Sequence, residues 1–174
     1  MRTTLIKRRQ LRRQSGVTMI ELMIAGMVMV VGFLGMMVLI TTAIATNNRN
    51  KMDTNATLAA QMVLEEIKSN YTTGLSPALV DCDGNSWTIG FAAGGAALSG
   101  GSIDFSESSP PANYRMNYTV CTANGGKATY DVRWHVTSLT ANTSAVTVSS
   151  KAKGASSDLK YFALPVTLRG YAGL

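Results

Sequence analysis

The side chains best suited to chemistry are few in this 174-residue chain, and they do not form a catalytic set. The cysteines are Cys82 and Cys121, and the single histidine is His135. These three residues cannot close a structural zinc site without carboxylates, because such sites use four ligands. Asp131 and His135 share one face of an expected strand, but no nucleophile accompanies them, so a solvated strand face is the better interpretation. We therefore expect no catalytic residue and no bound metal or cofactor.

A short acidic segment offers one further possibility. Residues 81–85 read Asp-Cys-Asp-Gly-Asn, which has a limited likeness to a calcium-binding loop. The later ligands of such a loop are missing, including the glutamate at its twelfth position. A simple Asp-Gly turn is the better interpretation.

The strongest signal lies near the beginning of the chain, where charge gives way to an apolar run. Six Lys and Arg residues precede Gly16, and the first acidic residue is Glu21. No charged residue occurs from Leu22 to Asn48. As a helix, residues 22–40 would span roughly 28 Å, close to the ~30 Å hydrocarbon core of a bilayer. The pattern predicts a membrane-inserting helix with a basic cytoplasmic flank.

The charge balance limits the classes of partner. The whole chain carries a formal charge of +6, which would suit a nucleic-acid-binding protein. Without residues 1–16, however, ten Lys and Arg are matched by ten Asp and Glu. We therefore expect no nucleic-acid partner, and we interpret the basic segment as a topology signal.

Three interpretations of the apolar segment compete. An ordinary secretory signal could be cut after residues 43–45, Ala-Ile-Ala, but the apolar run is too long for one. A permanent single-span anchor fits the length but gives Glu21 no role, although a carboxylate there is costly. The third interpretation accounts for it. Residues 15–22, Ser-Gly-Val-Thr-Met-Ile-Glu-Leu, resemble the class III signal of type IV pilins and type II secretion pseudopilins, although Val17 and Met19 replace the usual Phe and Leu.

The resemblance implies specific roles for three residues. A prepilin peptidase would cut after Gly16 and methylate the new amine of Val17. Glu21 would pair with the N-terminal amine of a neighbouring subunit, and breaking such a desolvated pair costs about 3–5 kcal/mol. The alternative, that Glu21 only stabilises the helix N-terminus through the helix dipole, stays open.

The helix is expected to continue beyond the membrane to about Ser69. Apolar residues recur there at spacings of three and four, which predicts a stripe that lies on the sheet of the same subunit. Residues 58–67 are similar to the second half of the long helix in PilV-like minor pilins and I-type minor pseudopilins. The stripe consists of Met52, Ala56, Ala59, Val63 and Ile67.

Short alternating runs after residue 70 predict a small antiparallel sheet. The clearest hairpin joins residues 114–122 to 127–137, with Tyr130, Val132, Trp134 and Val136 on one face. We expect further strands at 86–91 and at 159–169, the latter at an edge because of Pro165, and a poorly ordered loop at 92–109. The predicted fold is therefore α+β, a pilin fold with a long N-terminal helix packed on a small sheet. Its parts are a cleaved basic leader (1–16), a transmembrane and filament-core half-helix (17–45), an amphipathic half-helix (46–70) and a β-rich head (71–174).

A head outside the cytoplasmic membrane would lie in an oxidising compartment. A disulfide between Cys82 and Cys121 is then the expected state, with two free buried thiols as the alternative. Closing about 40 residues would stabilise the head by roughly 4 kcal/mol in the chain-entropy model.

The expected function follows from the resemblance. It implies a minor pilin of a type IV pilus, held in the bacterial inner membrane and then incorporated in or at the tip of the filament, to prime or modify assembly and to support adhesion. The implied partners are the prepilin peptidase, major and minor pilins, the inner-membrane assembly platform and the lipid bilayer. The alternatives are a minor pseudopilin of a type II secretion system and a membrane-anchored periplasmic binding module.

Overall fold

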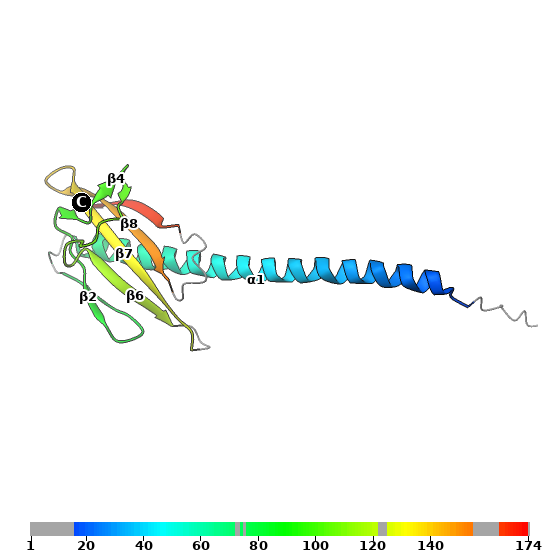
Figure 1. Cartoon of the computed structure of the whole chain (residues 1–174). Coiled ribbons are helices and arrows are strands. Elements are labelled where there is room, and N and C mark those ends of the chain that lie inside the picture. The colour runs from blue at the N-terminus through cyan, green and yellow to red at the C-terminus, as the bar shows by residue number, and fades with distance from the viewer. Residues whose placement is uncertain (1–15, 72–73, 75, 122–124, 155–163, 174) are drawn as a thin grey trace, which may run out of the picture. The chain divides into compact units, whose positions relative to one another are not determined.

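The computed structural model, shown in Figure 1, describes residues 16–71, 74, 76–121, 125–154 and 164–173. It confirms the α+β class, with a long helix and antiparallel strands. Apart from Gly16, the expected leader at 1–16 lies outside the described residues. The elements are α1 (Met19–Asn70), β1 (Ala78–Val80), β2 (Ser86–Thr88), β3 (Gly94–Gly95), β4 (Leu98–Ser99), β5 (Ser102–Ile103), β6 (Arg115–Cys121), β7 (Lys127–Ser138), β8 (Thr143–Lys153) and β9 (Val166–Gly173).

The chain divides into two compact units, Met1–Thr46 and Asn47–Leu174. Within the first unit, the described residues form the N-terminal part of α1. The second unit holds the rest of α1 and all the described strands, and we call it the head.

Side-chain hydrogen bonds mark both ends of α1. The Thr18 hydroxyl accepts the backbone N–H of Glu21 at 3.3 Å, the geometry of an N-cap residue. At the other end, the side-chain amide of Asn70 donates to the Glu66 carbonyl at 3.1 Å, which satisfies one of the carbonyls that a helix end leaves free. The expected end near Ser69 is confirmed within one residue.

Strand β7 is the centre of the main sheet. One edge pairs with β8, which in turn pairs with β9, and the other edge pairs with β6 and with the short β3. Every pairing is antiparallel. Gly95 allows the close approach of β3, because a Cβ there would lie 2.4 Å from the Trp134 carbonyl oxygen.

The core lies between α1 and the even-numbered face of the sheet. Tyr130, Val132, Trp134 and Val136 are buried on this face, as predicted from their alternation. The predicted helix stripe is also confirmed, except that Met52 is 40% exposed. The buried stripe therefore starts one turn later than expected. Its residues are Ala56, Ala59, Ala60, Val63, Leu64 and Ile67.

Other parts of the head differ from expectation. Residues 92–109, expected to be a poorly ordered loop, contain β3, β4 and β5. Strand β8 was not predicted. Strand β9 begins after Pro165, although a strand was expected from residue 159, and it does lie at an edge of the described sheet. The expected strand at 86–91 is limited to β2, and residues 123 and 124 of the 123–126 connection lie outside the described residues.

Candidate functional site

The predicted cleavage site lies immediately before the helix. Gly16, Val17 and Thr18 are exposed and non-helical, and α1 begins at Met19. Glu21 occupies the first turn, where the positive end of the helix dipole favours a carboxylate. Its backbone N–H is the one capped by Thr18. The peptide bond after Gly16 is therefore outside the regular hydrogen bonding of the helix.

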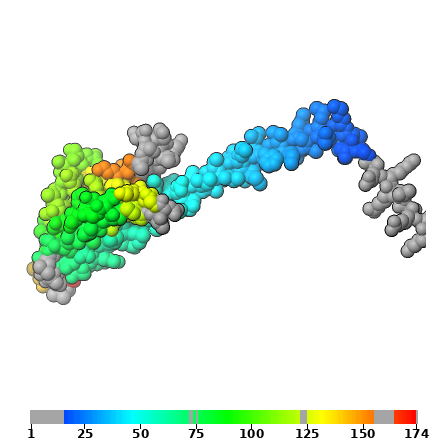
Figure 2. Space-filling model, turned by 90° about the horizontal axis from the view of Figure 1, so that it is seen from below, coloured from blue at the N-terminus to red at the C-terminus, as the bar shows by residue number. Residues whose placement is uncertain are grey.

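The apolar part of α1, from residue 19 to residue 48, is exposed along its whole length and packs on none of the residues that the structure describes. None of the 18 residues in its most apolar stretch is buried, and the helix is long and apolar enough to cross a membrane. Figure 2 shows this segment in blue, with its side chains at the surface. The hydroxyls of Thr41 and Thr42 donate to backbone carbonyls one turn earlier, for example Thr42 to Val38 at 2.9 Å. This pattern removes unpaired donors from an apolar surface.

The expected disulfide between Cys82 and Cys121 is present, with a Cα–Cα distance of 5.9 Å. Both residues are exposed, so the alternative of two buried thiols is wrong. The bond joins the turn after β1 to the end of β6. Asp83 lies close to both sulfur atoms, but sulfurs bonded to each other are not thiolate ligands, so this group holds no metal in the oxidised head.

The acidic segment at 81–85 forms the expected Asp-Gly turn. Asp81 is buried, and one carboxylate oxygen accepts the backbone N–H groups of Asp83 and Asn85 at 3.0 and 2.8 Å. Gly84 has a φ of 82°, the left-handed conformation that such a turn requires. Burial raises the pKa of the Asp81 carboxyl, but the hydrogen bonds that this carboxylate accepts, those from Asn85 foremost, together outweigh burial and hold that pKa below its ordinary value.

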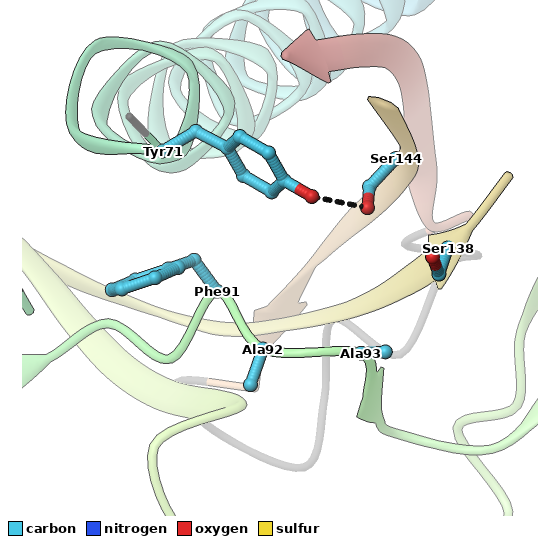
Figure 3. A pocket seen from close by; sticks show the side chains of 6 residues that line it. All are labelled: Tyr71, Phe91, Ala92, Ala93, Ser138 and Ser144. Atoms are coloured by element: carbon cyan, nitrogen blue, oxygen red, sulfur yellow. Dashed lines mark hydrogen bonds between the residues drawn. The ribbon is translucent and has the colours of Figure 1, made fainter. Parts of the chain in front are cut away.

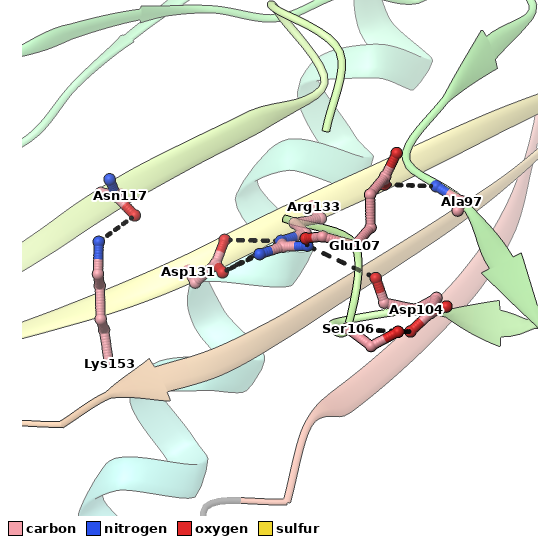
Figure 4. Close-up of polar contacts among 8 residues, drawn as sticks. All are labelled: Ala97, Asp104, Ser106, Glu107, Asn117, Asp131, Arg133 and Lys153. Atoms are coloured by element: carbon pink, nitrogen blue, oxygen red, sulfur yellow. Dashed lines mark hydrogen bonds and ion pairs between the residues drawn. The ribbon is translucent and has the colours of Figure 1, made fainter. Parts of the chain in front are cut away.

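The sheet face that points away from α1 is partly covered, which the sequence did not predict. Arg133, about 9% exposed, donates to the Asp131 carboxylate at 2.8 Å and to the Glu107 carbonyl at 2.8 Å (Figure 4). Its guanidinium also lies 5.0 Å from the centre of the Phe105 ring. Arg133 thus holds the segment after β5 against the sheet.

This arrangement corrects the interpretation of Asp131 and His135. Asp131 pairs with Arg133, and His135 donates from Nδ1 to the Ala96 carbonyl at 2.8 Å. Neither residue is on a freely solvated face, because residues 96–107 fold over it. Each has a structural partner, and nothing in the geometry joins them into an acid-base pair.

A hollow of about 360 Å³ lies where α1 ends (Figure 3). Tyr71 enters it and its hydroxyl lies 2.7 Å from that of Ser144 on β8. Phe91 forms another wall, and its ring meets that of Tyr71 edge-on at 6.4 Å. The described lining has no charged side chain, and the hydroxyls of Tyr71 and Ser144 are bonded to each other.

Comparison with known proteins adds no further assignment. No family model, curated protein or solved structure matches this chain. The structure itself, a long apolar N-terminal helix on a small antiparallel sheet, is compatible with a pilin-like fold.

Proposed function

We propose that this chain is a minor pilin of a type IV pilus, most similar to PilV-like subunits. A prepilin peptidase cuts after Gly16 and methylates Val17. The mature subunit is anchored in the inner membrane with its head in the periplasm. The assembly platform then incorporates it into the filament beside other pilins. There it primes or modifies assembly.

The observation that carries the proposal is the division of one helix into two environments. From residue 19 to residue 48 its only charged side chain is Glu21, and the apolar residues there are exposed. From Ala56 onward one face is buried against the sheet. A bilayer or the core of a filament would cover the first part, whereas the sheet already covers one face of the second. Gly16 is exposed and non-helical, which supports cleavage after it.

Glu21 gives the sharpest test of assembly. We expect Glu21→Gln to be cut normally but to reach sheared surface filaments at least tenfold less well than the wild type. The matched control is Glu65→Gln, since Glu65 is an exposed carboxylate on the same helix. The readout is the ratio of the subunit in the sheared filaments to that in the membrane. Equal ratios for the Glu21 variant and the wild type would contradict the pairing of Glu21 with a neighbouring amine.

Deletion of the chain distinguishes the proposal from the pseudopilin alternative. We expect fewer surface pili and an unchanged set of secreted proteins. Loss of secreted proteins with normal piliation would instead assign the chain to a type II secretion system. A chain that keeps its leader in the cell would fit a membrane-anchored binding module.

A further inference from the structure

The cations of the head gather on one face of the sheet. Ten Lys and Arg residues follow Gly16, and six of them occupy odd-numbered positions of β6 to β9. The strand registers pair odd positions with odd positions, and the even-numbered face packs on α1. Asp131 is the one acidic residue within the described strands. The six cations are Arg115, Lys127, Arg133, Lys151, Lys153 and Arg169.

Several of these cations are already engaged. Arg133 pairs with Asp131, and Arg169 donates to the Gly101 carbonyl. Lys127 and Lys153 make their contacts at exposed positions. Lys127 forms an exposed ion pair with Asp83. Lys153 donates to the Asn117 side chain at 3.3 Å, a contact drawn in Figure 4. An exposed ion pair contributes at most about 1 kcal/mol, so a ligand anion can displace it.

Lys127 and Lys153 line the same groove. It has a volume of about 560 Å³ and lies between β2 and the odd-numbered face of β6 to β8. Its other polar walls are Asn85, Asn117, Thr119 and Thr129. The hydroxyls of Thr119 and Thr129 lie 3.2 Å apart across paired strands, which fixes the floor. The groove is open to solvent, so a ligand held in it would stay partly exposed.

The spacing of the two lysines indicates a ligand with more than one negative charge. Lys153 is directly opposite Thr129, so Lys127 is its diagonal neighbour, and the backbones there are about 7–8 Å apart. Each ammonium carries three donors for a carboxylate or sulfate. The amides and hydroxyls between them offer both donors and acceptors, which suits the hydroxyls of a sugar ring.

We propose that this groove binds an acidic oligosaccharide, with Lys127 and Lys153 holding two of its anionic groups. A flat bilayer would reach the lysines at the rim but not the Thr119 and Thr129 floor. Single-stranded nucleic acid is held largely by stacking on exposed aromatic rings, and the aromatic residue of the described lining, Trp87, is partly buried. The inference goes beyond the proposed function and does not depend on assembly into a filament.

The test uses the full chain purified in detergent. The probes are a trigalacturonate, a sulfated heparin tetrasaccharide, an uncharged galactose trisaccharide and a single-stranded DNA oligomer. Because Trp87 lines the groove and Trp134 is fully buried, tryptophan emission reports binding alongside calorimetry. We expect one or both acidic saccharides to bind, with affinity that falls as salt is raised.

Matched variants test the place of binding. Lys127→Gln with Lys153→Gln should weaken acidic-saccharide binding at least tenfold. Arg49→Gln with Lys51→Gln removes the same charge from α1 and should change it less than twofold. Lys127→Arg with Lys153→Arg should restore binding, which separates loss of charge from loss of folding. An unchanged melting temperature of the glutamine variant provides a second check.

Three results would overturn the proposal. The first is no binding of either acidic saccharide. The second is an equal loss in the Arg49 and Lys51 variant, which would show a non-specific charge effect. The third is tighter binding of the DNA oligomer with the same dependence on Lys127 and Lys153, which would assign the groove to nucleic acid.

Discussion

Two effects of unequal size act on the Glu21 carboxylate: the helix dipole stabilises its charge, and transfer from water into a membrane destabilises it. A carboxylate in the first turn of a helix gains about 0.3–1 kcal/mol from the helix dipole. Moving an acidic side chain into the centre of a bilayer costs about 2.5–3.5 kcal/mol on insertion scales. The dipole alone therefore does not offset the loss of water if this end of α1 becomes covered. In the proposed assembly, a cut after Gly16 in a neighbouring subunit would create the positively charged amine that pairs with Glu21.

At the disulfide, the expected effect is large because the bond closes a long loop. The two cysteines are 39 residues apart, so Cys82→Ser with Cys121→Ser should lower the free energy of unfolding by about 4 kcal/mol. Chemical denaturation of the full chain in detergent measures this. Ser69→Ala, exposed on α1, is the control and should have little effect. A double-serine variant as stable as the wild type would contradict a structural role of the bond.

Asp81 makes the stability of the head depend on pH. Its folded-state pKa is lowered, so its contribution is present above its unfolded-state pKa near 3.8 and is lost as pH falls through the folded-state value. Asp81→Asn should destabilise the head by about 1–3 kcal/mol at pH 7, because the buried oxygens lose charge-assisted hydrogen bonds. The difference from the wild type should shrink below about pH 4. Denaturation at a series of pH values, with Glu65→Gln as control, measures the free-energy difference between Asp81→Asn and the wild type. A difference that stays constant with pH would contradict a role for the Asp81 charge.

At the scale of elements, the sequence predicted those parts whose pattern repeats. The spacing of the helix stripe and the alternation around Trp134 correctly indicated which faces of α1 and β7 are buried. Strand β8 was missed because its core-facing positions include Ser144 and Ser150, which interrupt the apolar alternation. The burial of Arg133 could not be predicted from the sequence, since its partners Asp104 and Glu107 are distant in the chain and accept through backbone carbonyls.

The packing of α1 on the sheet can be tested within one helix. Ile67 is fully buried and Ile40 is 52% exposed. Ile67→Ala should destabilise the head by about 2–5 kcal/mol, because it leaves a cavity against the sheet. Ile40→Ala should leave the unfolding of the head unchanged. Tryptophan emission during denaturation reports this, since Trp134 lies in the same core; equal effects of the two variants would contradict the observed packing.

The segment that covers the odd-numbered face depends on Arg133. Removing its side chain leaves the partly buried Asp131 without its counter-ion and the Glu107 carbonyl without its donor, so Arg133→Ala should cost about 1–3 kcal/mol. It should also speed protease cleavage within residues 98–107. Arg115→Ala, at an exposed position directly across from Arg133 on β6, is the matched control. Unchanged cleavage in the Arg133 variant would show that other contacts hold the segment.

At the scale of the whole molecule, the distribution of charge follows the proposed history of the chain. Six Lys and Arg residues precede Gly16, and the remainder is formally neutral. Such a division is expected if the basic segment sets the orientation of the helix in the membrane and is then removed. The candidate cleavage site was found from sequence because charge, glycine and apolar run occur in order. The groove was not, because its lysines meet only when the strands pair.

The most direct measurement is the intact mass of the protein purified from its own host. We predict a chain that begins at Val17 and carries one added methyl group on its amine. Gly16→Val should yield the full-length mass, because a bulkier residue blocks the cut. A wild-type chain that begins at Thr46, or one that keeps residues 1–16, would contradict the central claim.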